Sequence, residues 1–109
     1  MNRMLVLSVL FALGFGAAAA AETLDGTWAG GWETGDGVQI IVVGDRVIGF
    51  YRGDDYLTVE RSVSVPGGGA IDFTWPSGEA VLARDAKGEV RVTIRAKGKT
   101  EEIIPVKRD

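Results

Sequence analysis

A chain of 109 residues with a formal charge of −3 has room for a single domain. It contains no His and no Cys, which excludes Ser-His and Cys-His nucleophile pairs, His- or thiolate-bound metals and disulfides. The acidic balance argues against a nucleic-acid partner. The remaining reactive side chains show no spacing typical of a nucleophile with its base. The sequence therefore predicts a protein that is not an enzyme and that uses no cofactor and no bound metal.

Residues 1–21 have the parts of an export signal. Arg3 supplies a positive start, an apolar stretch follows, and a run of small residues offers a cleavage site before Glu22. We expect a mature domain of residues 22–109 in the periplasm or outside a bacterial cell, with no stable membrane insertion. The alternative is a retained membrane anchor, because residues 4–21 reach the short end of a bilayer span.

The rest of the chain has the composition of β-structure, with 11 Val and 7 Ile but 3 Leu. Seven turn segments rich in Gly, Pro or Asp divide it into eight runs of strand length. These turns are residues 35–37, 44–45, 53–55, 66–69, 76–78, 85–88 and 97–99. Because short turns join neighbouring antiparallel strands, we predict an all-β fold, a small eight-stranded antiparallel up-and-down meander barrel. A two-sheet sandwich is the alternative.

Apolar and polar residues alternate along the expected strands, as one buried face and one wet face require. In the fourth expected strand, Leu57, Val59, Val63 and Val65 share the face that we expect to be buried. Residues 38–43 are apolar on both faces, so we expect their outer face to be covered too, by another subunit.

Charge is distributed unevenly along the chain. Residues 22–60 hold 8 acids and 2 bases, whereas residues 61–109 hold 7 acids and 9 bases. The fold should therefore have an acidic half and a mildly basic half. This pattern fits a solvated surface, a steering field or a head-to-tail contact.

Residues 24–51 carry the most distinctive pattern. The opening reads Leu-Asp-Gly-Thr-Trp, and an apolar strand, a Gly-Asp turn and a strand ending in Phe-Tyr follow. This order resembles the calycin superfamily, and within it the avidins and more loosely the lipocalins. The resemblance implies a ligand-binding barrel in which Tyr51 matches a ligand-contacting Tyr. It also implies an Arg from the last strand packed over Trp28, here Arg108 or, as the alternative, Arg95.

Aromatic residues gather in the first half of the mature chain. Trp28 and Trp32 lie four apart, so on one strand they share a face with Gly30 between them and leave a gap for a flat or apolar ligand. The alternative is an ordinary core. The residues predicted to contact a ligand at the barrel mouth are Trp28, Trp32, Tyr51, Tyr56 and Trp75.

Four carboxylates fall in or near the first and third turns, Glu33, Asp36, Asp54 and Asp55. Loops of equal parity lie at the same end of a meander, so these acids could form a calcium site. Asp also favours tight turns for its own backbone hydrogen bonds, and we predict that turn role and no metal.

Two functions follow from these observations. In the first, the exported barrel binds a small apolar or aromatic ligand at its mouth without catalysis. In the second, the narrow barrel is filled by its own side chains and the protein is a structural or protein-interaction module. The partner of such a module would be another protein, an exported enzyme that it inhibits, or a second copy of itself in a homo-oligomer of the cell envelope.

Overall fold

The computed structural model describes residues 23–109, so the expected export signal and its cleavage lie outside the described residues. The described residues contain one short 3-10 helix, η2 (Trp32–Thr34), and no helix long and apolar enough to cross a membrane. The rest of the regular structure is strand, which confirms the all-β prediction. The strands are β2 (Gly26–Gly30), β3 (Val38–Val43), β4 (Arg46–Arg52), β5 (Asp55–Tyr56), β6 (Arg61–Ser64), β7 (Ala70–Trp75), β8 (Gly78–Arg84), β9 (Val90–Ala96) and β10 (Glu102–Arg108).

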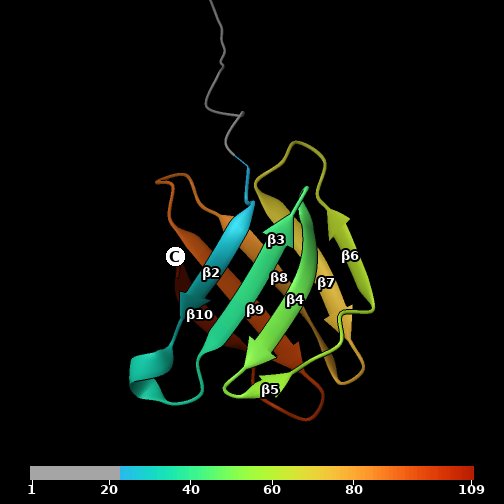
Figure 1. The fold of residues 1–109 in the computed structure, drawn as a ribbon, viewed down its shortest axis with the longest axis vertical. Coiled ribbons are helices and arrows are strands. Elements are labelled where there is room, and N and C mark those ends of the chain that lie inside the picture. Colours follow the sequence, from blue (N-terminus) through green and yellow to red (C-terminus); the bar gives the residue numbers. More distant parts are fainter. Residues whose placement is uncertain (1–22) are drawn as a thin grey trace, which may run out of the picture.

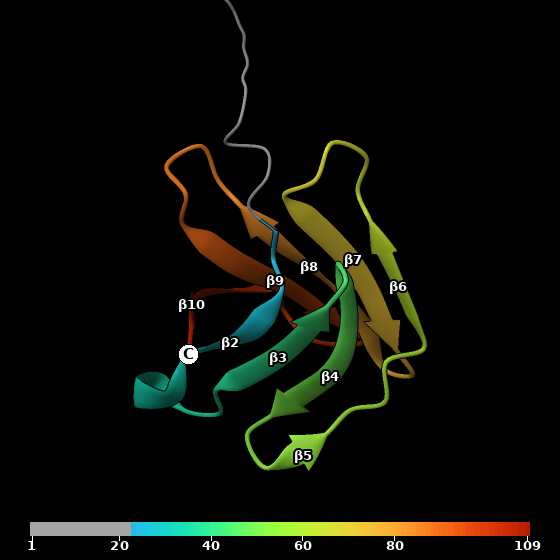
Figure 2. The same ribbon diagram turned by 45° about the horizontal axis from the view of Figure 1, so that its top comes forward.

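The strands form one antiparallel sheet in the order β5-β4-β3-β2-β10-β9-β8-β7-β6. Consecutive strands pair as a meander except β5 and β6, which are the two edges of the sheet, and β2 also pairs with β10, so the two ends of the described chain meet (Figure 1). The sheet curls into a half-barrel, and β4 contacts β6 and β7 (Figure 2). The seam of the barrel therefore lies between β4 and β6, in the middle of the sequence.

Two serine hydroxyls bridge this seam in place of a strand ladder. The backbone N–H of Val47 donates to Ser62 Oγ over 2.9 Å. Ser64 Oγ donates to the carbonyl oxygen of Asp45 over 2.7 Å. Backbone groups of β4 and of the turn before it thus find partners even though β4 and β6 do not pair as strands.

The fourth expected strand is two strands, β5 and β6, which raises the count from eight to nine. Leu57 and Val59, in the irregular segment between them, pack against the core as expected. Val63 and Val65 are exposed, so their predicted place on the buried face is wrong. The reason is that the serines bridging the seam alternate with these valines and turn toward β4.

The barrel interior is filled by apolar side chains, and the described residues include no buried polar or charged residue. Phe50 is fully buried and meets Phe73 edge-on, with ring centroids 5.1 Å apart. It also packs against Trp75, with centroids 4.8 Å apart. Burying each such ring contributes about 1.5–3 kcal/mol. Aromatic rings from β4 and β7 therefore fill the space between the facing parts of the sheet.

The acid-rich first half and the mildly basic second half of the domain occupy different parts of the sheet, as expected. The acidic first half of the domain contains β2 to β5, and the mildly basic second half contains β6 to β10. Residues 38–43 form β3, whose inward side chains are fully buried, whereas Val43 on the other face is 57 % exposed. Cover of that outer face by another subunit stays a prediction.

Candidate functional site

Trp28 lies buried on β2 and is held by polar contacts at its edge and face. Its indole N–H donates to the carbonyl oxygen of Leu24 over 2.7 Å. The guanidinium of Arg108 lies over the ring, 4.6 Å from its centroid, and donates to the carbonyl oxygen of Thr23 over 2.8 Å. The prediction that an arginine of the last strand packs over Trp28 is therefore confirmed for Arg108. Arg95 instead lies in β9 and pairs with carboxylates.

Trp32 does not share a strand or a face with Trp28. Strand β2 ends at Gly30, and Gly31 adopts a left-handed conformation with φ of 81° that turns the chain into η2. Trp32 in η2 is half exposed, so the prediction of a two-tryptophan wall is wrong. Gly30 has a different reason to be glycine, because a Cβ there would collide with the carbonyl oxygen of Pro105.

The other predicted ligand contacts lie in two separate places. Tyr51 and Tyr56 pair across β4 and β5 with ring centroids 5.1 Å apart, and Tyr56 is 54 % exposed. Because Phe50 points inward, its neighbour Tyr51 points outward. Trp75 is buried in the core. The structure thus joins the two tyrosines but does not gather all five aromatics around one cavity, and their role as ligand contacts stays a prediction.

The first and third turns lie at the same end of the barrel, as the meander predicts. This end, at the bottom of Figure 1, is called the lower end here. The backbone N–H of Gly53 donates to the carbonyl oxygen of Gly37 over 2.9 Å, which ties the two turns together. Within residues 23–109 no three carboxylates lie close enough to hold a metal ion.

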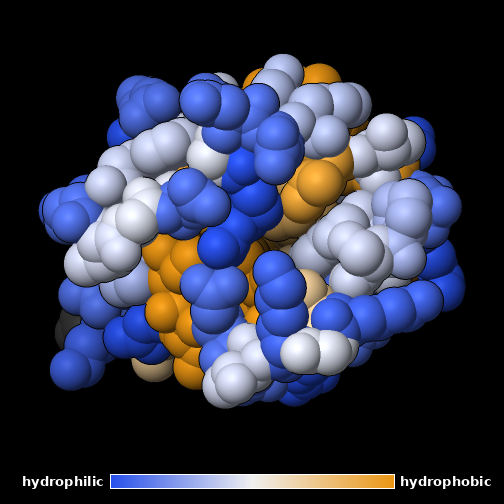
Figure 3. All heavy atoms as spheres, turned by 90° about the horizontal axis from the view of Figure 1, so that it is seen from below, coloured by the Kyte–Doolittle hydropathy of each residue, from blue (hydrophilic) through white to orange (hydrophobic). Residues whose placement is uncertain are grey.

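A groove of about 1110 Å³ runs along β10 from the lower end. Viewed from below, apolar surface lies open between hydrophilic rims (Figure 3). The groove is lined by side chains from β10, from the start of β9 and from the loop of residues 31–37 that contains η2, called the η2 loop. Its lining includes Trp28, Gly30, Gly31, Glu33, Thr34, Asp36, Arg52, Glu89, Arg91, Glu102, Ile103, Ile104, Pro105, Val106, Lys107 and Arg108.

Arg52 and Glu102 line the lower end of the groove and form an ion pair. Arg52 Nη2 donates to both carboxylate oxygens, over 3.2 and 3.4 Å. Arg52 Nη1 is buried and has no hydrogen-bond partner among the described residues. Because buried donors are usually paired, this arginine has unused hydrogen-bonding capacity. Residues from strands that are not neighbours in the sheet therefore meet here.

One edge of β10 is open within this groove. The N–H of Asp109 donates to the carbonyl oxygen of Thr27 on β2. Because alternate residues of a strand direct their backbone groups to the same edge, the backbone groups of Lys107, Pro105 and Ile103 also point toward the β2 side. Pro105 has no N–H and β2 ends at Gly30, so the ladder stops there. Ile103 lies beyond that point, and no backbone hydrogen bond from the η2 loop reaches it.

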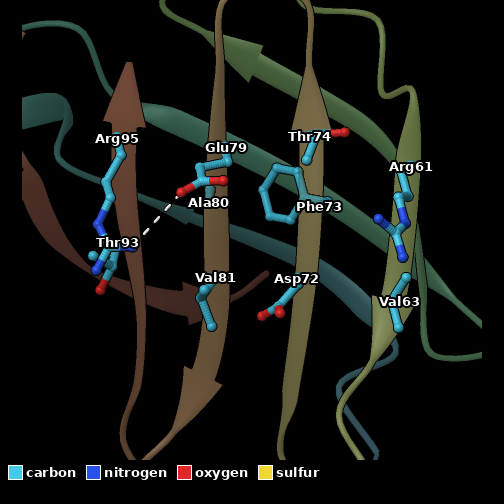
Figure 4. A pocket seen from close by; sticks show the side chains of 10 residues that line it. All are labelled: Arg61, Val63, Asp72, Phe73, Thr74, Glu79, Ala80, Val81, Thr93 and Arg95. Carbon is cyan, nitrogen blue, oxygen red and sulfur yellow. Dashed lines mark ion pairs between the residues drawn. The ribbon is translucent and has the colours of Figure 1, made fainter. Parts of the chain in front are cut away.

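A second hollow, of about 290 Å³, lies over β6 to β9 (Figure 4). Arg61 and Arg95 contribute cations to it, and Asp72 and Glu79 contribute carboxylates. Arg95 Nη1 lies 3.6 Å from Glu79, and the hydrogen bond of its Nε to Glu101 raises the pKa of Arg95 above its ordinary value. Balanced charges beside short threonine and valine side chains are typical of a solvated sheet face.

Comparison of this chain with protein-family models, curated proteins and solved structures found no match. The geometry itself identifies residues that the sequence reasoning missed, namely Arg52, Glu102, Ile103 and Pro105. Pro105 was the available signal, because proline inside a strand indicates an edge that needs no N–H.

Proposed function

We propose that this protein is an exported, non-catalytic binding module that recognises another protein through its outer surface. The filled interior supports this proposal most directly. Phe50, Phe73 and Trp75 pack on one another where a ligand-binding barrel has its cavity. Binding then falls to the outside of the half-barrel, for which the calycin-like contact between Arg108 and Trp28 provides a rigid scaffold.

Exposed apolar side chains identify the outer surfaces suited to this role. Val43, Ile48 and Tyr56, from β3, β4 and β5, are each more than half exposed. Among the large apolar residues that the structure describes, Ile103 on β10 is the most exposed, at 59 %. Apolar patches with polar rims are typical of protein interaction sites.

The groove along β10 favours a second candidate, the binding of a small apolar ligand. Its volume lies just above the range of about 300–1,000 Å³ that is usual for ligand sites, and buried Trp28 contributes to its lining. A ligand there would contact one of the five predicted aromatics rather than all of them. It would also change the emission of a tryptophan, which a protein partner at β3 to β5 would not require.

Photo-cross-linking in the exporting bacterium tests the proposal. A photo-reactive amino acid is placed, one position at a time, at Ile48, Tyr56 and Ile103, with Glu79 and Lys87 as exposed controls. We expect one protein to cross-link at one of the apolar positions and not at the controls. Equal cross-linking at all positions, or none together with a small molecule retained by the purified chain, would contradict the proposal.

A further inference from the structure

We infer that the groove along β10 takes an extended, basic and apolar segment of a partner protein, which adds to the open edge of β10. The inference rests on the proposed function and assigns it a surface and a partner chemistry. It depends on three independent features of the lower end of the groove: a free backbone edge, an exposed apolar side chain and unpaired acids.

The free edge supplies backbone recognition. Ile103 directs one N–H and one carbonyl oxygen away from β9, toward the space that β2 leaves when it ends at Gly30. An extended peptide carries matching donors and acceptors, which is how added strands bind to sheet edges. A small apolar molecule offers no such pair, so the edge favours a polypeptide occupant.

The exposed apolar side chains lie on the same strand. Ile103 is 59 % exposed, and Pro105, two residues on, points to the same side and is also exposed. An added strand presents its own alternate side chains on that side, so an apolar residue of the partner would cover Ile103. The groove would therefore recognise the apolar side chains of the partner segment as well as its backbone.

The charged residues of the groove indicate which side chains the partner segment carries. Glu33 and Asp36 in the η2 loop line the groove and form no ion pair within the described chain, and Glu102 adds a third carboxylate whose charge Arg52 offsets. Two unpaired acids beside an apolar strip complement a lysine or arginine next to an apolar residue. The groove as a whole carries as many bases as acids, because Arg52, Arg91, Lys107 and Arg108 also line it. The preference for a basic residue therefore applies at the lower end of the groove, where the η2 loop lies, and an acidic segment would meet repulsion there.

Fluorescence anisotropy of the purified mature chain tests this with defined probes. The probe is a labelled, end-capped heptapeptide of alternating valine and lysine. One control peptide has glutamate for lysine, and a second has N-methylated valines, which cannot donate backbone hydrogen bonds. At about 0.15 M salt, we expect the lysine peptide to bind at least about tenfold more tightly than either control.

Protein variants locate the site. Ile103→Arg should weaken the lysine peptide about tenfold, whereas Ile48→Arg, at a similarly exposed position on β4, should leave its affinity unchanged. Glu33→Lys with Asp36→Lys should reverse the preference toward the glutamate peptide. Each variant is checked for an unchanged thermal transition, so a loss of binding is not a loss of folding.

Three results would overturn the inference: no binding of the lysine peptide at millimolar concentration, equal binding of the N-methylated peptide, or equal loss in Ile48→Arg. A photo-cross-link confined to Ile48 or Tyr56 would overturn the groove assignment while leaving the proposed function intact. A small-molecule adduct on the purified chain with no protein cross-link would remove both.

Discussion

Replacing Phe50 by alanine tests whether the interior is filled. Phe50 is fully buried between Phe73 and Trp75, so the change opens a void on the order of 100 Å³, which at about 24 cal/mol per Å³ costs about 2.4 kcal/mol. The lost burial of the ring adds about 1.5–3 kcal/mol. We expect Phe50→Ala to lower the free energy of unfolding by about 4–5 kcal/mol, a large share of the stability of so small a domain.

Urea unfolding followed by tryptophan fluorescence measures this loss. Phe50→Leu serves if the alanine variant does not fold, and it should cost up to about 1.5 kcal/mol because most of the volume is kept. Ile48→Ala, on the exposed face of the same strand, is the matched control and should cost less than about 0.5 kcal/mol. A loss below about 2 kcal/mol for Phe50→Ala would refute the filled interior, because removing a ring beside an existing cavity creates little new void.

Four further substitutions probe the rest of the scaffold. Ser62→Ala leaves the N–H of Val47 without its acceptor, so it should cost about 1–3 kcal/mol and speed amide hydrogen exchange in β4. Ser64→Ala leaves the carbonyl oxygen of Asp45, in the turn before β4, without its donor and should cost a similar amount. Unchanged exchange in Ser62→Ala would contradict the bridging role. Arg108→Ala removes the cation over Trp28. It should lower the free energy of unfolding by about 1–2 kcal/mol and shift tryptophan emission to the red. Unchanged emission would show that the stacking does not persist in solution. Hydrogen bonds from two backbone N–H groups in the β8–β9 turn lower the pKa of Asp85 below 3.8, so the ionised side chain stabilises the fold above that pH and this stabilisation is lost as pH falls through the lowered pKa. Asp85→Asn should therefore be less stable than the parent chain at neutral pH, and the difference in unfolding free energy should shrink in acid. A difference that stays constant with pH would contradict the assignment.

The positions of the turns could be predicted from the sequence because glycine, proline and aspartate act locally. The fourth expected strand could not, since its register depends on a partner across the barrel. Ser62 bonds to β4 and Ser64 to the turn before it, and this distant contact turns Val63 outward against the simple alternation. Tertiary hydrogen bonding thus outweighed hydrophobic pattern at the seam.

The candidate site was harder to predict than the fold. The spacing of Trp28 and Trp32 suggested one strand, but Gly31 has a positive φ that the sequence does not reveal. Arg52 and Glu102 lie fifty residues apart and meet through the curl of the sheet. The packing of Arg108 over Trp28 was predictable because the resemblance supplied a long-range contact, which local pattern alone cannot supply.

Native mass spectrometry of the chain purified from an exporting bacterium tests the central claim most directly. A filled barrel that acts through its surface predicts the mass of residues 22–109 with no small molecule, alone or in a complex with a second protein. A reproducible small-molecule mass, one per chain and lost on Trp28→Ala, would contradict the claim and restore a ligand site as the function.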